Sequence, residues 1–204
     1  MKWRLIVIKT WGNILCAIDT ETTGLDCSKH EIIEICILPL TNGLELYTEI
    51  LPFHMFLKPY GAIDEDALKV NKRTLKDILA KGTDPYIAAD MFDEWFSRLP
   101  IGDNKRILPI GQNYQFDMGF IKRWLGETTY NDCFHYHYRD SMISANFLND
   151  RADLRVEVRP FDKINLTELA RNLKIPLTHA HSALDDCVAT AKVYKRLVEM
   201  FTFP

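Results

Sequence analysis

Three short stretches of this 204-residue chain carry carboxylates at spacings that could act together in one site. Carboxylates held close together repel one another and raise one another's pKa, and a bound divalent cation removes that repulsion. Oxygen ligands without cysteine are typical of Mg²⁺ or Mn²⁺ sites. Two such ions with one histidine can hydrolyse phosphodiester bonds, so the sequence predicts a nuclease. The stretches are Asp19-Thr-Glu21-Thr-Thr-Gly24, Asn113-Tyr-Gln-Phe-Asp117 and His181-Ser-Ala-Leu-Asp-Asp186.

The spacing within each stretch indicates which acids point inward. Asp19 and Glu21 are two residues apart, so both point to the same face of an extended strand. Asp117 shares its helical stripe with apolar residues and has no basic partner there, which favours a functional acid over one that only stabilises the helix dipole. In the last helix, Asp186 lies on a small and apolar stripe and Asp185 on a polar one. Asp186 is therefore the inward acid of that pair.

His181 is the candidate general base among the histidines. It lies directly before the last helix, within reach of whatever Asp186 binds, and histidine titrates near neutral pH. His179, two residues upstream, is the rival base. The aromatic run over residues 134–138 could stack nucleic-acid bases, but packing as a half-buried strand over residues 133–139 is the preferred interpretation.

The elements that must position these residues follow from hydrophobic periodicity. A hairpin turn is expected at Asn42-Gly43, and residues 150–163 are expected to be irregular. A group of strands followed by alternating helices and strands indicates an α/β protein with a mixed sheet flanked by helices. The expected strands cover residues 13–18, 31–40, 47–57, 106–110 and 133–139, and the expected helices cover residues 64–80 (as one or two helices), 85–99, 115–125, 141–149, 166–173 and 182–200.

Composition narrows the class of protein. The net charge is −3 and the pI about 6.1, which argues against a protein that coats nucleic acid and less against one that grips a few terminal nucleotides. The five cysteines form no C-x-x-C pair, which favours a reducing compartment. No stretch reaches membrane-spanning length and the N-terminus lacks a signal-peptide core, so a cytoplasmic location is expected, with no membrane partner.

With these residues in place, the chain resembles the DEDDh 3′→5′ exonucleases, the group of the proofreading (epsilon) subunit of bacterial DNA polymerase III and RNase T. The first two stretches are similar to the first two motifs of that family, and the third resembles the last motif in its histidine form. The tyrosine subgroup would need a tyrosine where this chain has Ser182. The resemblance implies one DEDDh exonuclease domain over residues 1–204 with an RNase H-like fold, a mixed five-stranded sheet flanked by helices.

The same resemblance implies a role for each residue of the site. Asp19, Glu21 and Asp186 would hold one divalent ion, Mg²⁺ or Mn²⁺, and Asp19 would hold a second together with Asp117 through water. His181 would deprotonate the attacking water, and the products would be nucleoside 5′-monophosphates. The positions that match terminal-nucleotide contacts of the family are Thr22, Leu25, Val70 and Asn71.

Some positions depart from the family pattern. Gln112 and Asn71 stand where many members have histidine, and residues 150–163 form a longer stretch than expected, a candidate insertion facing substrate or partner. The expected substrate is the 3′ end of single-stranded DNA, and an exoribonuclease of the RNase T type is the alternative. A DNA polymerase subunit is a candidate partner. From a different class, the competing hypothesis is a non-catalytic nucleic-acid-binding or polymerase-partner module, which would be free to lose carboxylates, and none is missing.

Overall fold

The computed structural model describes residues 7–70, 74–177 and 182–202. Within these ranges, five strands form one sheet in the order β3-β2-β1-β4-β5. β1 pairs antiparallel with β2 and parallel with β4, so the sheet is mixed, as the sequence predicts. β2 pairs antiparallel with β3, and β4 pairs parallel with β5. The strands are β1 (Ile14–Thr22), β2 (Ile32–Leu40), β3 (Phe53–Phe56), β4 (Ile107–Gly111) and β5 (Arg139–Asp140).

The helix at residues 127–133 was not predicted, and the other helices begin close to the positions that the sequence predicts. Pro85 begins α3 directly after Asp84, whose carboxylate accepts hydrogen bonds from the N–H groups of Tyr86 and Ile87 as an N-cap. The segment predicted as one or two helices contains both α1 and α2. The helices are α1 (Glu65–Val70), α2 (Leu75–Lys81), α3 (Pro85–Ser97), α4 (Tyr114–Leu125), α5 (Glu127–Cys133), α6 (Ser141–Leu154), α7 (Leu166–Asn172) and α8 (Ala183–Thr202).

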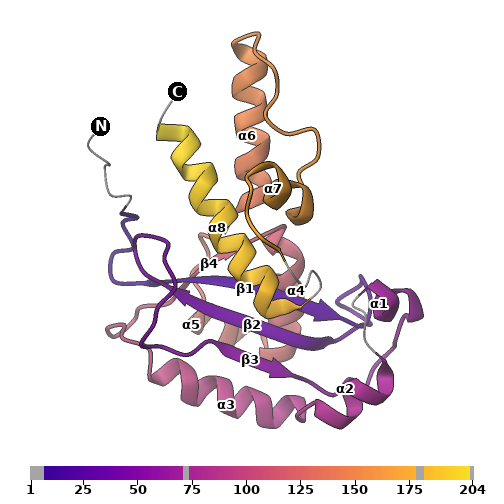
Figure 1. Cartoon of the computed structure of the whole chain (residues 1–204). Coiled ribbons are helices and arrows are strands. Elements are labelled where there is room, and N and C mark those ends of the chain that lie inside the picture. Colours follow the sequence, from indigo (N-terminus) through magenta and orange to yellow (C-terminus); the bar gives the residue numbers. More distant parts are fainter. Residues whose placement is uncertain (1–6, 71–73, 178–181, 203–204) are drawn as a thin grey trace.

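The sheet separates two helical layers (Figure 1). α8 crosses one face, while α3, α4 and α5 cover the other. Side chains of β1 alternate between the layers: Cys16 and Ile18 pack with α3 and α4, and Leu15 and Ala17 pack with α8. Because both faces of this central strand are buried, its sequence is a continuous apolar run up to the first acid.

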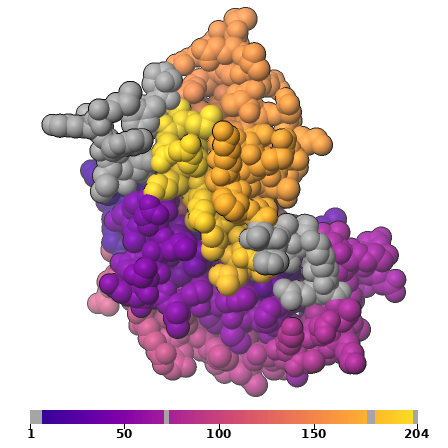
Figure 2. Space-filling model, in the orientation of Figure 1, coloured from indigo at the N-terminus to yellow at the C-terminus, as the bar shows by residue number. Residues whose placement is uncertain are grey.

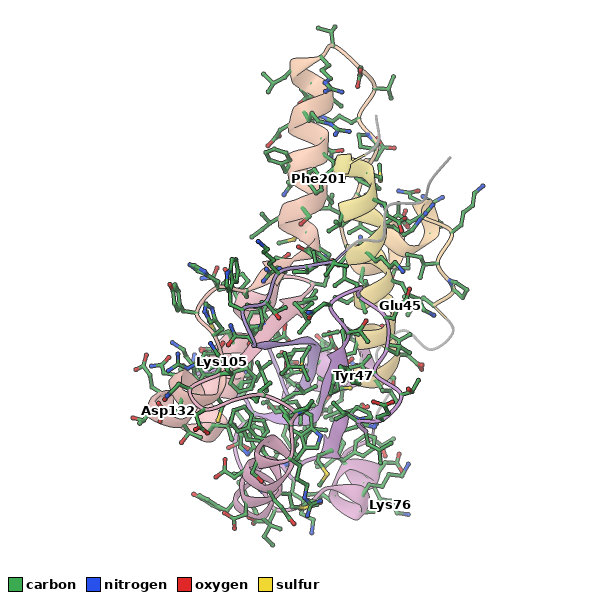
Figure 3. The ribbon with its side chains drawn as sticks, turned by 90° about the vertical axis from the view of Figure 1, so that its left-hand side faces the viewer. Glu45, Tyr47, Lys76, Lys105, Asp132 and Phe201 are labelled. Atoms are coloured by element: carbon green, nitrogen blue, oxygen red, sulfur yellow. The ribbon has the colours of Figure 1, made fainter. Side chains whose placement is uncertain are left out.

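A smaller core joins α6 and α7 to the C-terminal half of α8. Its buried residues include Leu148 of α6, Leu169 of α7 and Leu197 of α8. In the side view of Figure 3, Phe201 lies beside α6, and its ring is centred 5.4 Å from that of Phe147. The space-filling view shows α8 between the N-terminal segments and the α6–α7 unit (Figure 2). α8 is therefore the helix that holds the two cores together.

The strand predicted over residues 47–57 is shorter in the structure. β3 begins at Phe53, after Pro52, which has no N–H to donate to a ladder, and not at residue 47. The predicted turn is present, since the Leu44 N–H donates to the Thr41 carbonyl, but the segment beyond it makes a single isolated bridge to β2, between Leu40 and Leu46.

The half-buried strand predicted over residues 133–139 is wrong for most of its length. Cys133 ends α5, Phe134 forms one isolated bridge, and β5 contains two residues only. Tyr130 and Phe134 stack at 4.7 Å between ring centroids where α5 ends, and residues 135–138 belong to no helix or strand. Tyr136 is 76% exposed instead of packing in a strand.

The stretch expected to be irregular is partly helical. α6 continues to Leu154, and the irregular segment begins at Arg155. None of the described helices is long and apolar enough to cross a membrane. The five cysteines are all free thiols.

Candidate active site

The end of β1 distributes its polar side chains between the two faces of the sheet. Asp19 pairs across β1 and β2 with Cys36, which packs in the core beneath α8. Glu21, two residues on, lies on the same face, as predicted. Thr20 lies between them and points to the opposite face, toward α4, where its side chain meets Asp117. One strand end therefore supplies both sides of the site.

α8 brings a third acid to the first two. Asp186 lies in the first turn of α8 and is buried, whereas Asp185 is half-buried, as the helical stripes predict. One carboxylate oxygen from each of Asp19, Glu21 and Asp186 lies within 4.8 Å of the others. Three hard oxygen ligands at this separation fit a divalent cation such as Mg²⁺ or Mn²⁺.

The electrostatics of Asp19 also indicate a bound divalent cation. Burial raises the pKa of its carboxyl well above the usual range, and the charges of Asp117, Glu21 and Asp186 raise this pKa further. Ionised carboxylates in such a group destabilise the folded chain unless positive charge joins them. A divalent cation supplies that charge, so the donor set and its electrostatics both fit a metal ion.

Asp117 is held apart from this group by β1. It lies in the first turn of α4, is 4% exposed, and its Oδ1 accepts hydrogen bonds from the N–H and Oγ1 of Thr20 at 2.9 and 2.7 Å. Burial raises the pKa of Asp117 to about 7, while the two bonds from Thr20 oppose the rise and the charge of Asp140 adds to it. The predicted inward orientation of Asp117 is confirmed, and its partner is Thr20.

Asp140 is a buried acid whose structural role the sequence did not predict. Its Oδ2 accepts a hydrogen bond from the N–H of Tyr114 at 2.7 Å, and its Oδ1 caps the start of α6 through Met142 and Ile143. It therefore ties the start of α4, one turn before Asp117, to the end of β5. An acid directly before Ser141 at a predicted helix start was the available signal.

Glu34 and His54 form a second feature that the sequence analysis missed. Glu34 is the cross-strand partner of Glu21 in the β1–β2 register and is 1% exposed. Its Oε1 lies 2.8 Å from Nε2 of His54, which comes from β3. A fourth carboxylate thus lies beside the three that converge. The signal was a single glutamate inside the apolar run Ile-Ile-Glu-Ile-Cys-Ile of residues 32–37.

The predicted substrate contacts are placed in part. Thr22 is buried and its Oγ1 donates to the Gly24 carbonyl at 2.7 Å, so this hydroxyl stabilises the turn after β1. Leu25 is 83% exposed and Val70, at the end of α1, is 55% exposed, and their contact with substrate stays a prediction. Asn71, His179 and His181 lie outside the described residues.

Gln112 is half-buried, and its side chain makes hydrogen bonds within the fold. Its side-chain amide donates to the Ile164 carbonyl at 2.7 Å, and its carbonyl oxygen accepts from the hydroxyl of Ser141. Gln112 therefore links the end of β4 to α6 and to the segment before α7. The residue that departs from the family pattern has a structural function here.

Comparison with known proteins relates the chain to exonucleases and to a DNA polymerase. The family model RNase_T, described as Exonuclease, matches residues 16–194. The PolC-type DNA polymerase III of Staphylococcus aureus (strain bovine RF122 / ET3-1) is 27% identical over 183 residues, which are 89% of this chain and 11% of the polymerase. The chain thus spans about a tenth of the length of the curated relatives it matches.

Solved structures share the fold at low sequence identity. Escherichia coli exonuclease I in complex with a dT13 oligonucleotide has a TM-score of 0.69 and 17% identity, over 94% of this chain and 43% of that chain. The zinc-bound complex of exonuclease I with single-stranded DNA has a TM-score of 0.70 and 17% identity, over 93% and 43%. Cell-death related nuclease 4 has a TM-score of 0.68 and 16% identity, over 92% and 64%.

These likenesses identify the mixed sheet and its flanking helices as the RNase H-like fold of exonucleases. The family model covers the three converging carboxylates, all of β2 and β1 from Cys16 onward. On that match, the chain belongs to the RNase T family of exonucleases.

Proposed function

We propose that this chain is a metal-dependent 3′→5′ exonuclease that releases nucleoside 5′-monophosphates from the 3′ end of single-stranded DNA. The observation that carries the proposal is the convergence of three carboxylates, with ligand oxygens within 4.8 Å of one another, at the end of β1. Membership of an exonuclease family supports the reaction class. All of residues 1–204 would belong to this one exonuclease domain.

Each acid has a proposed part in the reaction. Asp19, Glu21 and Asp186 would hold one divalent ion, and Asp19 with Asp117, through water, would hold the second. Such ions lower the pKa of water and stabilise the charge that develops on phosphate oxygens. Thr20 keeps Oδ1 of Asp117 fixed through two hydrogen bonds, so that this acid is oriented before substrate arrives.

His181 would act as the general base. It would accept a proton from the water that attacks the phosphorus of the terminal phosphodiester, while the bond from that phosphorus to the 3′ oxygen of the shortened strand breaks and this oxygen takes a proton from solvent to become a hydroxyl. Histidine suits this step because it titrates near neutral pH. Thr22, Leu25, Val70 and Asn71 would contact the terminal nucleotides.

The preference for DNA has its support in the comparisons. The exonuclease I structures carry single-stranded oligodeoxynucleotides, and the curated relative is a DNA polymerase. A 3′→5′ exoribonuclease of the RNase T type is the second candidate, favoured by the name of the family model. A polymerase subunit is the proposed protein partner, and the cytoplasm remains the expected location.

The test is a time course on a 5′-labelled single-stranded oligonucleotide, DNA and RNA side by side, with Mg²⁺, Mn²⁺ or EDTA. We expect a metal-dependent ladder that shortens from the 3′ end, and the faster substrate reveals the sugar preference. Asp186→Asn should abolish cleavage in a folded protein, since it removes the charge of one of the three converging carboxylates. Asp185→Asn is the matched control, because this neighbour is half-buried and outside the converging group.

The competing binding module predicts a different outcome. Folded protein that binds the oligonucleotide but leaves it intact with either metal would favour a non-catalytic module on the same fold. Cleavage that survives in both Asp186→Asn and His181→Ala would refute the residue assignment while leaving the reaction class in place.

A further inference from the structure

A pocket of about 300 Å³ lies beside the proposed active site, on the opposite face of the sheet from α8. Its walls come from the start of β2, the end of β3 and the helices α3 and α4, which lie below and behind the sheet in Figure 1. This volume is at the lower end of the range for small-molecule pockets, which suits one flat ring system and not a large ligand. None of the residues discussed above as metal or substrate contacts lines it.

The pocket and the carboxylates lie at the same edge of the sheet. β2 runs antiparallel to β1, so the start of β2, which lines the pocket, lies beside the end of β1, which carries the acids. The shared wall is His30: a Cβ on Gly24 would lie 2.5 Å from its ring, so the ring packs directly on the turn after β1. A strand held at the carboxylates can therefore continue past this turn into the pocket.

The distance between the carboxylates and the pocket can be measured along α4. Asp117 begins the helix, and Phe120 and Trp124, which line the pocket, follow on the same stripe. At 1.5 Å per residue they lie about 5 and 10 Å beyond Asp117 along the helix axis. Stacked nucleotides rise about 3.4 Å each, so the pocket is two or three nucleotides from the acids.

Two tyrosines at the mouth of the pocket expose their rings. Tyr86 is 82% exposed and Tyr60 is 68% exposed. Asp84 accepts a hydrogen bond from the Tyr60 hydroxyl at 2.7 Å, which holds that ring, and one from the backbone N–H of Tyr86 at 2.9 Å, which holds the main chain that carries the second ring. Exposed aromatic rings are stacking platforms for nucleobases.

Arg123 is the group of the pocket that can contact a phosphate. Arg123 uses one N–H of its guanidinium to bind the Cys27 carbonyl at 2.6 Å, and a guanidinium has five such donors, so others remain for a phosphate. The carboxylate of Glu31 accepts from the N–H groups of Tyr60 and Gly61 at 2.6 and 2.8 Å. These two N–H donors offset the negative charge of Glu31 on that side.

We propose that this pocket binds a nucleobase of the substrate strand two or three nucleotides upstream of its 3′ end, stacked on Tyr86, with Arg123 contacting the adjoining phosphate. The inference rests on the proposed exonuclease function and adds an upstream binding subsite to it. It predicts that long substrates gain affinity from the pocket and that a substrate of one nucleotide gains none.

The test compares two substrates with Tyr86→Ala. The short one is the p-nitrophenyl ester of thymidine 5′-monophosphate, and the long one is a single-stranded octanucleotide of the sugar that is cleaved faster. We expect kcat/KM to fall about tenfold on the octanucleotide, in line with the loss of one stacked base, and to stay unchanged on the ester. In EDTA, where cleavage stops, Kd for a fluorescein-labelled octanucleotide should rise by a similar factor.

The controls separate stacking from folding. Tyr86→Phe keeps the ring and should behave as wild type. Tyr136→Ala removes a tyrosine outside the pocket whose exposure, 76%, is close to the 82% of Tyr86. It should leave kcat/KM unchanged on both substrates. Because the ring of Tyr86 is exposed and its N–H bond to Asp84 does not depend on the side chain, Tyr86→Ala should fold normally.

The outcomes distinguish the two proposals. Wild-type protein that hydrolyses neither substrate would refute the exonuclease function. Wild-type protein that hydrolyses both, with an unchanged ratio between them and an unchanged octanucleotide Kd in Tyr86→Ala, would overturn the pocket assignment alone. A change confined to inhibition by free thymidine 5′-monophosphate would also overturn it, because the occupant would then be a released nucleotide.

Discussion

Thr20→Val removes one hydrogen bond from the buried Asp117 and leaves the other in place. The Oγ1 of Thr20 donates to Asp117 Oδ1 at 2.7 Å, and the backbone N–H of the same residue donates to the same oxygen at 2.9 Å. Valine keeps the branched shape and the N–H but has no hydroxyl. The variant therefore isolates the contribution of a single charge-assisted hydrogen bond.

The size of the effect depends on whether Asp117 is ionised. A hydrogen bond to a charged group contributes about 1.5–3 kcal/mol, and one between neutral groups about 0.5–1.5 kcal/mol. The pKa of Asp117 is about 7 without metal, so its carboxyl is protonated at pH 5.5 and ionised at pH 8.5. Thr20→Val should lower the free energy of unfolding by about 1 kcal/mol at pH 5.5 and about 2 kcal/mol at pH 8.5.

The diagnostic quantity is the difference between the stability that Thr20→Val loses at pH 5.5 and the stability that it loses at pH 8.5. About 1 kcal/mol corresponds to a rise of a little less than one unit in the pKa of Asp117, at 1.36 kcal/mol per unit. The sign follows from linkage: a carboxyl whose folded pKa is raised loses its contribution to stability as pH rises through that pKa. The variant, with the higher pKa, should therefore lose more stability than wild type at the higher pH.

The assay is urea unfolding in EDTA at pH 5.5 and 8.5, with Thr190→Val as the matched control. Thr190 is fully buried in α8, one turn after Asp186, and its hydroxyl has no hydrogen-bond partner among the described residues. Removing that hydroxyl should leave stability unchanged or raise it. Equal losses in the two variants, or a loss in Thr20→Val that does not grow with pH, would refute the reasoning.

Three further changes follow from the same geometry. The raised pKa of Asp117 predicts that metal-free protein loses about 2 kcal/mol of stability between pH 5.5 and 8 and that Mg²⁺ restores it, as thermal unfolding would measure. Glu34→Gln should weaken divalent-ion binding about tenfold, because it removes a buried charge beside Glu21, and a metal titration of activity would show this. Gly111→Ala should destabilise the protein by about 1–3 kcal/mol in urea unfolding, since its Cβ would lie 2.7 Å from Cβ of Tyr114.

A different result would contradict each of these three predictions. Stability in EDTA that rises from pH 5.5 to 8 would contradict the raised pKa of Asp117. If Glu34→Gln needs the same metal concentration for activity as wild type, the carboxylate of Glu34 does not contribute to binding the ion. Gly102→Ala is the control for crowding, because the nearest side-chain atom would lie 3.9 Å from its Cβ, and an equal loss in both alanine variants would exclude the contact with Tyr114 as the cause.

Local patterns predicted the elements well where one period dominated. The apolar runs of β1 and β2 and the 3–4 spacing of α4 and α8 predicted these elements to within a few residues. Prediction failed at residues 133–139, where α5 ends at Cys133 and Phe134 stacks on Phe92 of α3 and on Tyr130, so the segment does not continue as a strand until Arg139. It also failed at residues 47–52, where Pro52 and a lack of ladder partners leave the chain outside the sheet.

The chain alone determined which acids face inward, because the strand period of two and the helical period are local properties of Asp19, Glu21, Asp117 and Asp186. Only the tertiary structure decided what those acids meet. Strand order and register place Glu34 beside Glu21, and the packing of α4 beneath β1 brings Thr20 to Asp117. The upstream pocket likewise exists only once α3 and α4 pack under β2 and β3. These contacts join residues distant in sequence, and no local period contains them.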